Sequence, residues 1–172
     1  MRSLICYESM YGNTREVAEA IGSGLASTFE VAVAPISEVT DEMVRGSDLV
    51  VVGAPTHAHG MPRPVSRDGA ASRGLEHGAE LEPGAHDDGV REWLARAEPF
   101  DNAVAAFDTR VDMNPLLSGQ ASHAISRRLR RLGGRELVDP ESFLVDKDDT
   151  LLDGELARAS QWGARIADVM GA

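Results

Sequence analysis

Apolar runs rich in β-branched residues alternate along the chain with segments whose apolar residues recur at helical spacing. The run Leu49–Gly53 has no charged or polar side chain, which is typical of a strand buried on both faces of a parallel sheet. The runs predict five strands, the last one interrupted: Leu4–Tyr7, Phe29–Ala34, Leu49–Gly53, Ala103–Phe107, and Glu136–Val138 with Phe143–Val145.

Helical periodicity fills the intervals between these strands. The predicted helices are Asn13–Ala26, Asp41–Arg45, Asp87–Ala97, Gln120–Leu132 and Gly154–Met170. Their expected buried positions are Val17, Ala18, Ile21 and Leu25 in the first, Val90, Trp93 and Leu94 in the third, and Leu156, Trp162, Ile166 and Val169 in the last. Each set forms one apolar stripe, as expected for helices that cover a sheet.

Two stretches interrupt this alternation. Residues 54–86 are rich in Gly, Pro and Ala, so they predict an irregular insertion at about 62–86, with a short helix at Pro64–Arg73 and no assigned structure at His77–His86. Residues Asp108–Ser118 predict a second loop.

Strands that alternate with helices predict an α/β fold, a doubly wound parallel sheet of order 2-1-3-4-5 with helices on both faces. At 172 residues we expect one domain over 1–172. Ligands of such sheets bind outside the carboxyl ends of the strands, at the point where the strand order reverses. The loops after strands 1, 3 and 4 are therefore the candidate site.

Net charge restricts the partners. The formal charge is −11, and residues 76–112 contribute ten acids against three arginines. Nucleic acid binding depends on cations, so it is not expected. The acidic face predicts a basic redox protein as partner, although the same acids also serve solubility. No apolar run approaches the length needed to span a membrane, no signal peptide is evident, and the lone Cys6 permits no internal disulfide, so we expect a cytoplasmic protein, a monomer or weak dimer.

The first of the three loops carries the most informative chemistry. Residues Glu8–Thr14 combine hydroxyls, a glycine and free N–H groups at a helix start, which suits a phosphate. The loop has no lysine or arginine, unlike a Walker-type loop, so a single phosphate monoester fits better than a triphosphate. The alternative is an ordinary turn in which Asn13 or Thr14 caps the helix.

The segment Ser9-Met10-Tyr11-Gly12-Asn13-Thr14 resembles the flavin mononucleotide (FMN) phosphate loop of the flavodoxin family, in the form found in the flavodoxin domains of diiron flavoproteins. The second loop, Gly53–Pro62, is similar to the family's segment beside the isoalloxazine ring. This resemblance implies a short-chain flavodoxin-like three-layer sandwich that binds FMN and transfers electrons.

The resemblance also implies roles for individual residues. Six residues would hold the phosphate: Ser9, Met10, Tyr11, Gly12, Asn13 and Thr14. Six would border one side of the ring, with Gly60 expected near flavin N5: Pro55, Thr56, His57, Ala58, His59 and Gly60. Four would cover its other side, with Arg110 as a cation near the ring: Asp108, Thr109, Arg110 and Asp112.

Both ring-bordering loops lack the aromatic side chains that usually sandwich the ring in flavodoxins, so we expect weaker FMN binding than is typical of the family. Two alternatives remain open. One is an FMN-dependent NAD(P)H:quinone-type oxidoreductase on the same fold, with residues 62–86 as a lid; the other is a flavodoxin-fold module that has lost FMN.

Several other residues carry little functional signal. No catalytic nucleophile comes with a base, and His57 and His59 have no further ligands nearby, so neither catalytic nor metal residues are assigned. Cys6, Trp93 and Trp162 are expected in the core. The run 127–131 contains four arginines and predicts a solvated helix face, with docking of an acidic redox partner as the alternative.

Overall fold

The computed structural model describes residues 1–57, 59–76 and 80–171. Its sheet is parallel, with the order β2-β1-β3-β4-β5, and β6 also pairs with β4. The strands are β1 Arg2–Tyr7, β2 Glu30–Pro35, β3 Leu49–Pro55, β4 Ala103–Val111, β5 Arg135–Glu136 and β6 Glu141–Val145. The predicted fold class is therefore confirmed.

The fifth strand is interrupted, as the sequence predicted. β5 lies beside Ala103 and Val104 at the start of β4, whereas β6 lies beside residues 107–111 at its end. The two short strands therefore act as one edge strand with a break around Pro140, a residue that has no N–H to donate to a ladder.

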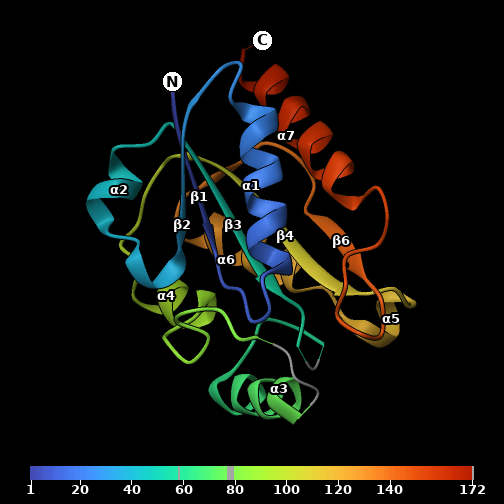
Figure 1. The fold of residues 1–172 in the computed structure, drawn as a ribbon. Coiled ribbons are helices and arrows are strands. Elements are labelled where there is room, and N and C mark those ends of the chain that lie inside the picture. Colours follow the sequence, from blue (N-terminus) through green and yellow to red (C-terminus); the bar gives the residue numbers. More distant parts are fainter. Residues whose placement is uncertain (58, 77–79, 172) are drawn as a thin grey trace.

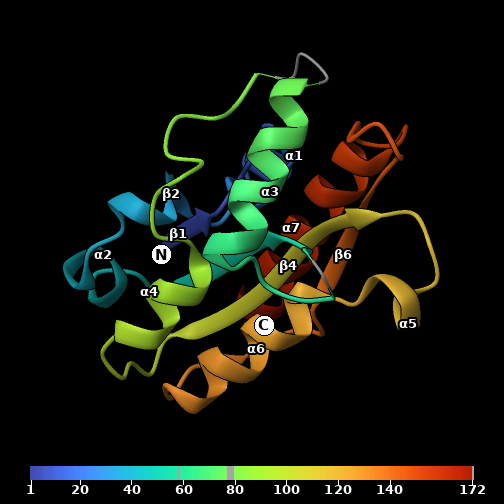
Figure 2. The ribbon, with the colours of Figure 1, turned by 90° about the horizontal axis from the view of Figure 1, so that it is seen from below.

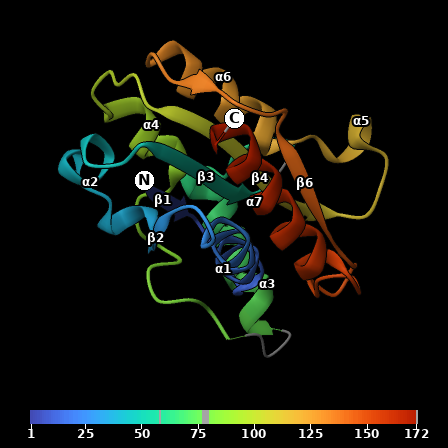
Figure 3. The ribbon, with the colours of Figure 1, turned by 90° about the horizontal axis from the view of Figure 1, so that it is seen from above.

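Helices cover both faces of the sheet, as Figures 1 and 3 show. One face carries α1 Asn13–Leu25 and α7 Glu155–Gly171; the other carries α2 Asp41–Arg45, α4 Val90–Arg96 and α6 Ala121–Arg131. A 3-10 turn (η1) spans Ile36–Glu38, and α5 spans Pro115–Ser118. No helix among the described residues is both long and apolar enough to cross a membrane.

The core confirms most of the predicted apolar stripes. The four predicted positions of α1 and the three of α4 are all buried, and so are Cys6, Trp93 and Trp162. In α7, however, Leu156 and Val169 are 41% and 49% exposed, so their predicted burial is wrong.

Close backbone contact between α1 and α7 explains this error. A Cβ at Gly163 would lie 2.3 Å from the carbonyl oxygen of Ile21, so the two helices touch where there is no side chain. This contact turns a narrow face of α7 toward the core and leaves the flanking Leu156 and Val169 in solvent. The buried residues of that face are Ala159, Trp162, Gly163, Ile166 and Ala167.

The predicted loop at Asp108–Ser118 is also wrong in its first part. β4 continues to Val111, because Asp108 and Thr109 find partners in β3 on one side and in β6 on the other. Residues 115–118 then form the short helix α5, with Asn114 as its N-cap.

The segment 62–86 contains more regular structure than the sequence predicted. Helix α3 spans Pro64–Glu76, three residues longer than expected. Figures 1 and 2 show α3 lying across the carboxyl edge of the sheet, below the ends of β1 and β3. Of the predicted unstructured stretch 77–86, residues 77–79 lie outside the described part, and residues 80–86 form coil and turns.

Candidate functional site

The structure brings the loops after β1, β3 and β4 together at the carboxyl edge of the sheet. A crevice with a volume of about 60 Å³ lies between them. It is lined by Ser9, Met10, Tyr11, Asn13, Thr14, Pro55, Thr56, His57, Thr109, Arg110, Val111, Val145 and Asp149. Ten of these thirteen lining residues are among the sixteen site residues that the sequence predicted.

The start of α1 offers unused hydrogen-bond donors to this crevice. Gly12 precedes the helix with φ of 98°, and no side chain caps the helix end. The alternative of an ordinary turn capped by Asn13 or Thr14 is therefore wrong. The Gly12 N–H donates to Ser9 Oγ at 3.1 Å. Within the described residues, no acceptor is found for the N–H groups of Met10, Tyr11, Asn13 and Thr14. Such a helix start favours an anion.

Side-chain hydrogen bonds hold the three loops in register. The hydroxyls of Thr14 and Thr109 lie 2.8 Å apart and join the first loop to β4. Thr56 Oγ1 accepts the N–H of Ala121 at 2.9 Å, which ties the second loop to the start of α6. Asn13 Nδ2 donates to the carbonyl oxygen of Asp149. These polar side chains therefore position the loops, and the free backbone N–H groups remain for a ligand.

An ion pair that the sequence did not indicate flanks the first loop. Arg15 Nε donates to both carboxylate oxygens of Glu82 at 3.2 Å, and a Cβ on Gly12 would lie 3.2 Å from Glu82 Oε1. Glu82 reaches this place because its N–H donates to the carbonyl oxygen of Met10. Neither Glu82 nor Asp149 carried a sequence signal, since both approach the loop only through tertiary folding.

The second loop is a tight turn. His57 and Gly60 exchange two backbone hydrogen bonds of 2.8 and 3.0 Å, so both backbone groups of Gly60 are occupied. His59 has φ of 72°, a left-handed conformation that histidine adopts more readily than most residues, and it pairs with Gly119. The predicted site residue Ala58 lies outside the described residues.

His57 is held in its neutral form. Burial is the main cause of a pKa lowered to about 4, and the nearby charges of Arg73 and Arg67 lower it further. At neutral pH the imidazole is therefore an uncharged group at the wall of the crevice.

A pH titration tests this environment. Because the folded-state pKa of His57 lies below its ordinary value of 6.5, the unfolded chain binds a proton first as the pH falls. We expect the stability that neutral His57 contributes to the fold to be present above pH 6.5. This stability should be lost as the pH falls from 6.5 to about 4, at up to about 1.4 kcal/mol per pH unit. Urea denaturation over this pH range should show that the free energy of unfolding falls less steeply in His57→Gln than in the parent protein. The control variant His123→Gln, at an exposed site, should lose as much as the parent protein.

Only some of the four residues predicted to cover the other side of the ring lie at the crevice. Thr109 and Arg110 line the crevice, but Asp108 is completely buried and its Oδ2 accepts the N–H of Ser122 at 2.8 Å. Burial raises the pKa of Asp108. Asp112 is exposed and lies outside the crevice lining. Asp108 therefore faces the sheet and α6, because it belongs to β4 and not to a loop.

Arg110 does not extend freely toward a ligand. Its guanidinium donates to the carbonyl oxygens of Val111 and Met113 at 3.3 and 2.8 Å, and so it closes its own loop. Its Nε–H is buried without an acceptor in the described part of the chain. An unused buried donor beside a crevice is a group that an acceptor atom of a ligand can satisfy.

Helix α3 packs against the first loop. Tyr11 Oη donates to the carbonyl oxygen of Ala70, and a Cβ on Gly74 would meet the Tyr11 ring at 2.5 Å. The small residues of α3 therefore let the helix approach the loop closely. Met10, Ala70, Ala71 and Ala85 form an apolar cluster of their own, separate from the two main core clusters.

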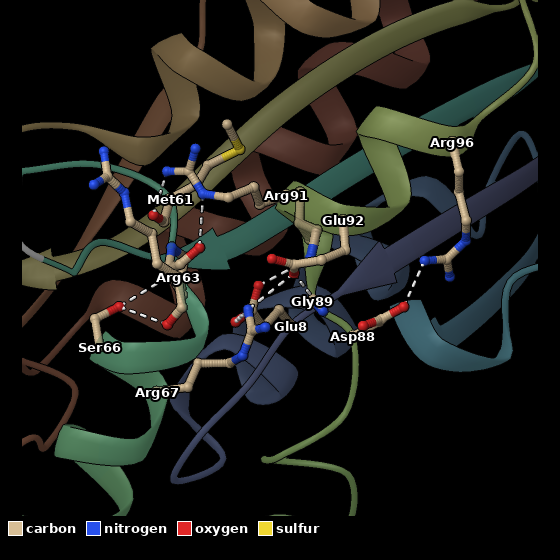
Figure 4. Close-up of polar contacts among 12 residues, drawn as sticks. Glu8, Met61, Arg63, Ser66, Arg67, Asp88, Gly89, Arg91, Glu92 and Arg96 are labelled. Carbon is tan, nitrogen blue, oxygen red and sulfur yellow. Dashed lines mark hydrogen bonds and ion pairs between the residues drawn. The ribbon is translucent and has the colours of Figure 1, made fainter.

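A buried ion-pair network fixes the other side of α3 (Figure 4). Arg67 pairs with Glu8 at 3.4 Å and with Glu92 at 3.0 Å, and Glu8 also accepts the N–H of Val90 at 2.9 Å. Burial, only partly offset by these partners, raises the pKa of Glu8. A second cavity of about 280 Å³ adjoins this network on the β2 side and is lined mainly by acids and hydroxyls. It lies outside the predicted phosphate loop except for Ser9.

An open parallel sheet of the order β2-β1-β3-β4-β5 with helices on both faces is a flavodoxin-like fold, and in this chain an uncapped helix start lies at its switch point. The flavodoxin family model matches residues 5–77, which include the first two loops. This match confirms the resemblance that the loop sequences carry, and proteins of that family typically bind flavin.

Solved structures confirm the fold. A flavodoxin from the domain Archaea has a TM-score of 0.67 at 22% identity, with 100% of both chains covered. The Flv1 flavodiiron core from Synechocystis has a TM-score of 0.62 at 20% identity, covering 99% of this chain and 36% of that one. A flavodoxin, WrbA-like protein from Agrobacterium tumefaciens has a TM-score of 0.62 at 19% identity, covering 98% and 96%. A search of curated proteins finds no match to the sequence.

Proposed function

We propose that this chain binds FMN, with the phosphate at residues 9–14 and the ring between the second loop and the end of β4. The observation that carries this proposal is the uncapped start of α1 with its free N–H groups. These neutral donors and the helix dipole suit a phosphate monoester without a metal ion. The small crevice fits the phosphate end, so the ring would lie toward the open edge of the loops.

Bound FMN would accept and return one or two electrons. The residues of this chain would orient it: the first loop would hold the phosphate, and the neutral imidazole of His57 and the cationic side chain of Arg110 would border the ring. No side chain in the crevice forms a nucleophile with its own base within the described residues, so the chemistry would belong to the cofactor. The proposed role is electron transfer to and from a basic redox protein attracted by the acidic surface.

The phosphate contribution provides the test. Titration of the apoprotein, followed by flavin fluorescence, should show binding of FMN and about tenfold or greater weakening with riboflavin, which lacks the phosphate. Tight, subnanomolar FMN binding would contradict the weaker affinity expected from the missing aromatic residues. Equal affinity for both flavins would overturn the phosphate assignment, and binding of neither would favour a module without FMN.

Helix α3 favours a second candidate, an FMN-dependent NAD(P)H:quinone-type oxidoreductase. Its packing on Tyr11 places a cover over the carboxyl edge of the sheet, where a carrier needs an open surface for its partner. Stopped-flow mixing of the FMN-loaded protein with NADPH separates the two functions. Direct, saturable reduction without a partner reductase supports the enzyme, and its absence supports the carrier.

A further inference from the structure

One wall of the crevice comes from the loop between β6 and α7. Asp149 of this loop lines the crevice together with residues of the first loop. Asn13 Nδ2 donates to the carbonyl oxygen of Asp149, so the two loops are joined directly. Among the described lining residues, Arg110 and Asp149 are the ones that carry a charge at neutral pH, since His57 is held neutral. A carboxylate therefore lies at a crevice whose free N–H groups suit an anion.

Backbone hydrogen bonds hold Asp149 in a defined place. Asp146 Oδ1 accepts the N–H groups of Asp148 and Thr150, both at 2.9 Å. The Asp146 N–H donates in turn to the carbonyl oxygen of Thr150 at 2.8 Å. Asp149 itself has φ of 58°, a left-handed conformation that aspartate and asparagine adopt more readily than most residues. The loop therefore keeps this residue beside the crevice.

The carboxylate of Asp149 is not neutralised by a direct partner. Within residues 1–57, 59–76 and 80–171, no hydrogen bond or ion pair engages it. Glu82, the other carboxylate beside the first loop, differs because Arg15 Nε donates to both of its oxygens. Burial raises the pKa of Tyr11, and the charge of Asp149 raises it further, so this charge acts on the first loop.

We propose that Asp149 is a specificity-determining residue of the crevice, whose charge opposes a dianionic phosphate and keeps the affinity for FMN low. This inference rests on the proposed function and goes beyond it, because it assigns part of the expected weak binding to one side chain. A phosphate monoester carries close to two negative charges above neutral pH. Like charges in a partly buried crevice repel more strongly than they do in bulk water. FMN would therefore exchange with FMN in solution instead of remaining permanently bound.

The variant Asp149→Asn tests this role. It removes the charge but keeps the size of the side chain, the tolerance of a left-handed backbone and the carbonyl oxygen that accepts from Asn13. Flavin fluorescence titration of the apoprotein at about pH 8, where carboxylates are ionised, should show about tenfold tighter FMN binding than in the parent protein. The affinity for riboflavin, which lacks the phosphate, should stay within about twofold of the parent value.

Asp148→Asn is the matched control. It removes the same charge one residue away, from an exposed side chain that lies outside the crevice lining. Because solvent and salt screen an exposed charge, its affinity for FMN should stay within about twofold of the parent value.

Inorganic phosphate provides a measurement that needs no flavin. The backbone N–H signals of Asn13 and Thr14 in ¹H–¹⁵N NMR spectra of the full chain should shift at several-fold lower phosphate concentration in Asp149→Asn than in the parent protein. If neither flavin binds to either protein, the proposed function fails. The phosphate titration then still decides whether Asp149 opposes a phosphate at the first loop.

Four results would overturn the proposal. The first is an unchanged affinity for FMN or, where no flavin binds, for phosphate in Asp149→Asn. The second is equal tightening in Asp148→Asn, which would indicate the general field of an acidic protein. The third is equal tightening for riboflavin, which would place the effect at the ring. The fourth is weaker FMN binding in Asp149→Asn together with a parent affinity that rises with Mg²⁺, which would make the carboxylate a metal bridge to the phosphate.

Discussion

Replacing Trp162 with alanine should lower the free energy of unfolding by about 3–5 kcal/mol, the largest single-residue effect that we expect on stability. Trp162 is 2% exposed and packs edge to face against Phe107 and Phe143, with ring centroids 6.5 and 6.2 Å away. These three rings fill the space between α7, β4 and β6, so the truncation leaves a cavity that the rigid sheet cannot close.

Urea denaturation measures this loss, and the same helix supplies the control. Val169→Ala removes an apolar side chain that is 49% exposed, so its effect should stay within about 0.5 kcal/mol. Trp162→Phe retains a ring, so its loss of unfolding free energy should lie between those expected for Trp162→Ala and Val169→Ala. This variant keeps the prediction testable if Trp162→Ala does not fold. Similar losses for Trp162→Phe and Val169→Ala would contradict the role of the ring cluster.

Substitution of Gly12 by alanine should weaken FMN binding by about tenfold to a hundredfold, which corresponds to the loss of one charge-assisted hydrogen bond at the phosphate. Gly12 has φ of 98°, and a Cβ there would approach Glu82 Oε1 to 3.2 Å and the Arg15 guanidinium to 3.4 Å. The loop must therefore relax, and its free N–H groups then move away from a common centre. This prediction rests on the proposed function.

Gly154→Ala is the matched control for backbone strain. Gly154 also has a positive φ, 87°, but a Cβ there meets nothing within 4 Å, and the residue lies outside the crevice lining. Both variants should lose about 1–2 kcal/mol of stability from the left-handed conformation. Only Gly12→Ala should lose affinity in the flavin fluorescence titration. Equal affinity in the two variants would remove Gly12 from the phosphate site.

Helix α3 connects the fold to the choice between carrier and enzyme. It lies on the first loop through Tyr11 and is held on its other side by the pairs of Arg67 with Glu8 and Glu92. A cover fixed on both sides limits the surface through which a large partner reaches the crevice. The stopped-flow comparison with NADPH is therefore the experiment that best separates the two functions.

The sequence by itself determined the layers of this protein and the position of its crevice. Continuous apolar runs such as Leu49–Val52 and the helical stripe of α1 depend only on local periodicity, so the order of strands and helices followed from them. The Ser9–Thr14 segment carried its own signal, because a glycine and free N–H groups at a helix start suit a phosphate whatever surrounds them.

Only the tertiary structure decided features that arise from contacts between distant segments. Asp108 belongs to β4 and is buried because β3 and β6 both pair with it, although its local sequence predicted a loop. The close approach of α1 and α7 at Gly163 decided which face of α7 is buried. Glu82 lies beside Gly12 although many residues of chain separate them, and no periodicity encodes such a meeting.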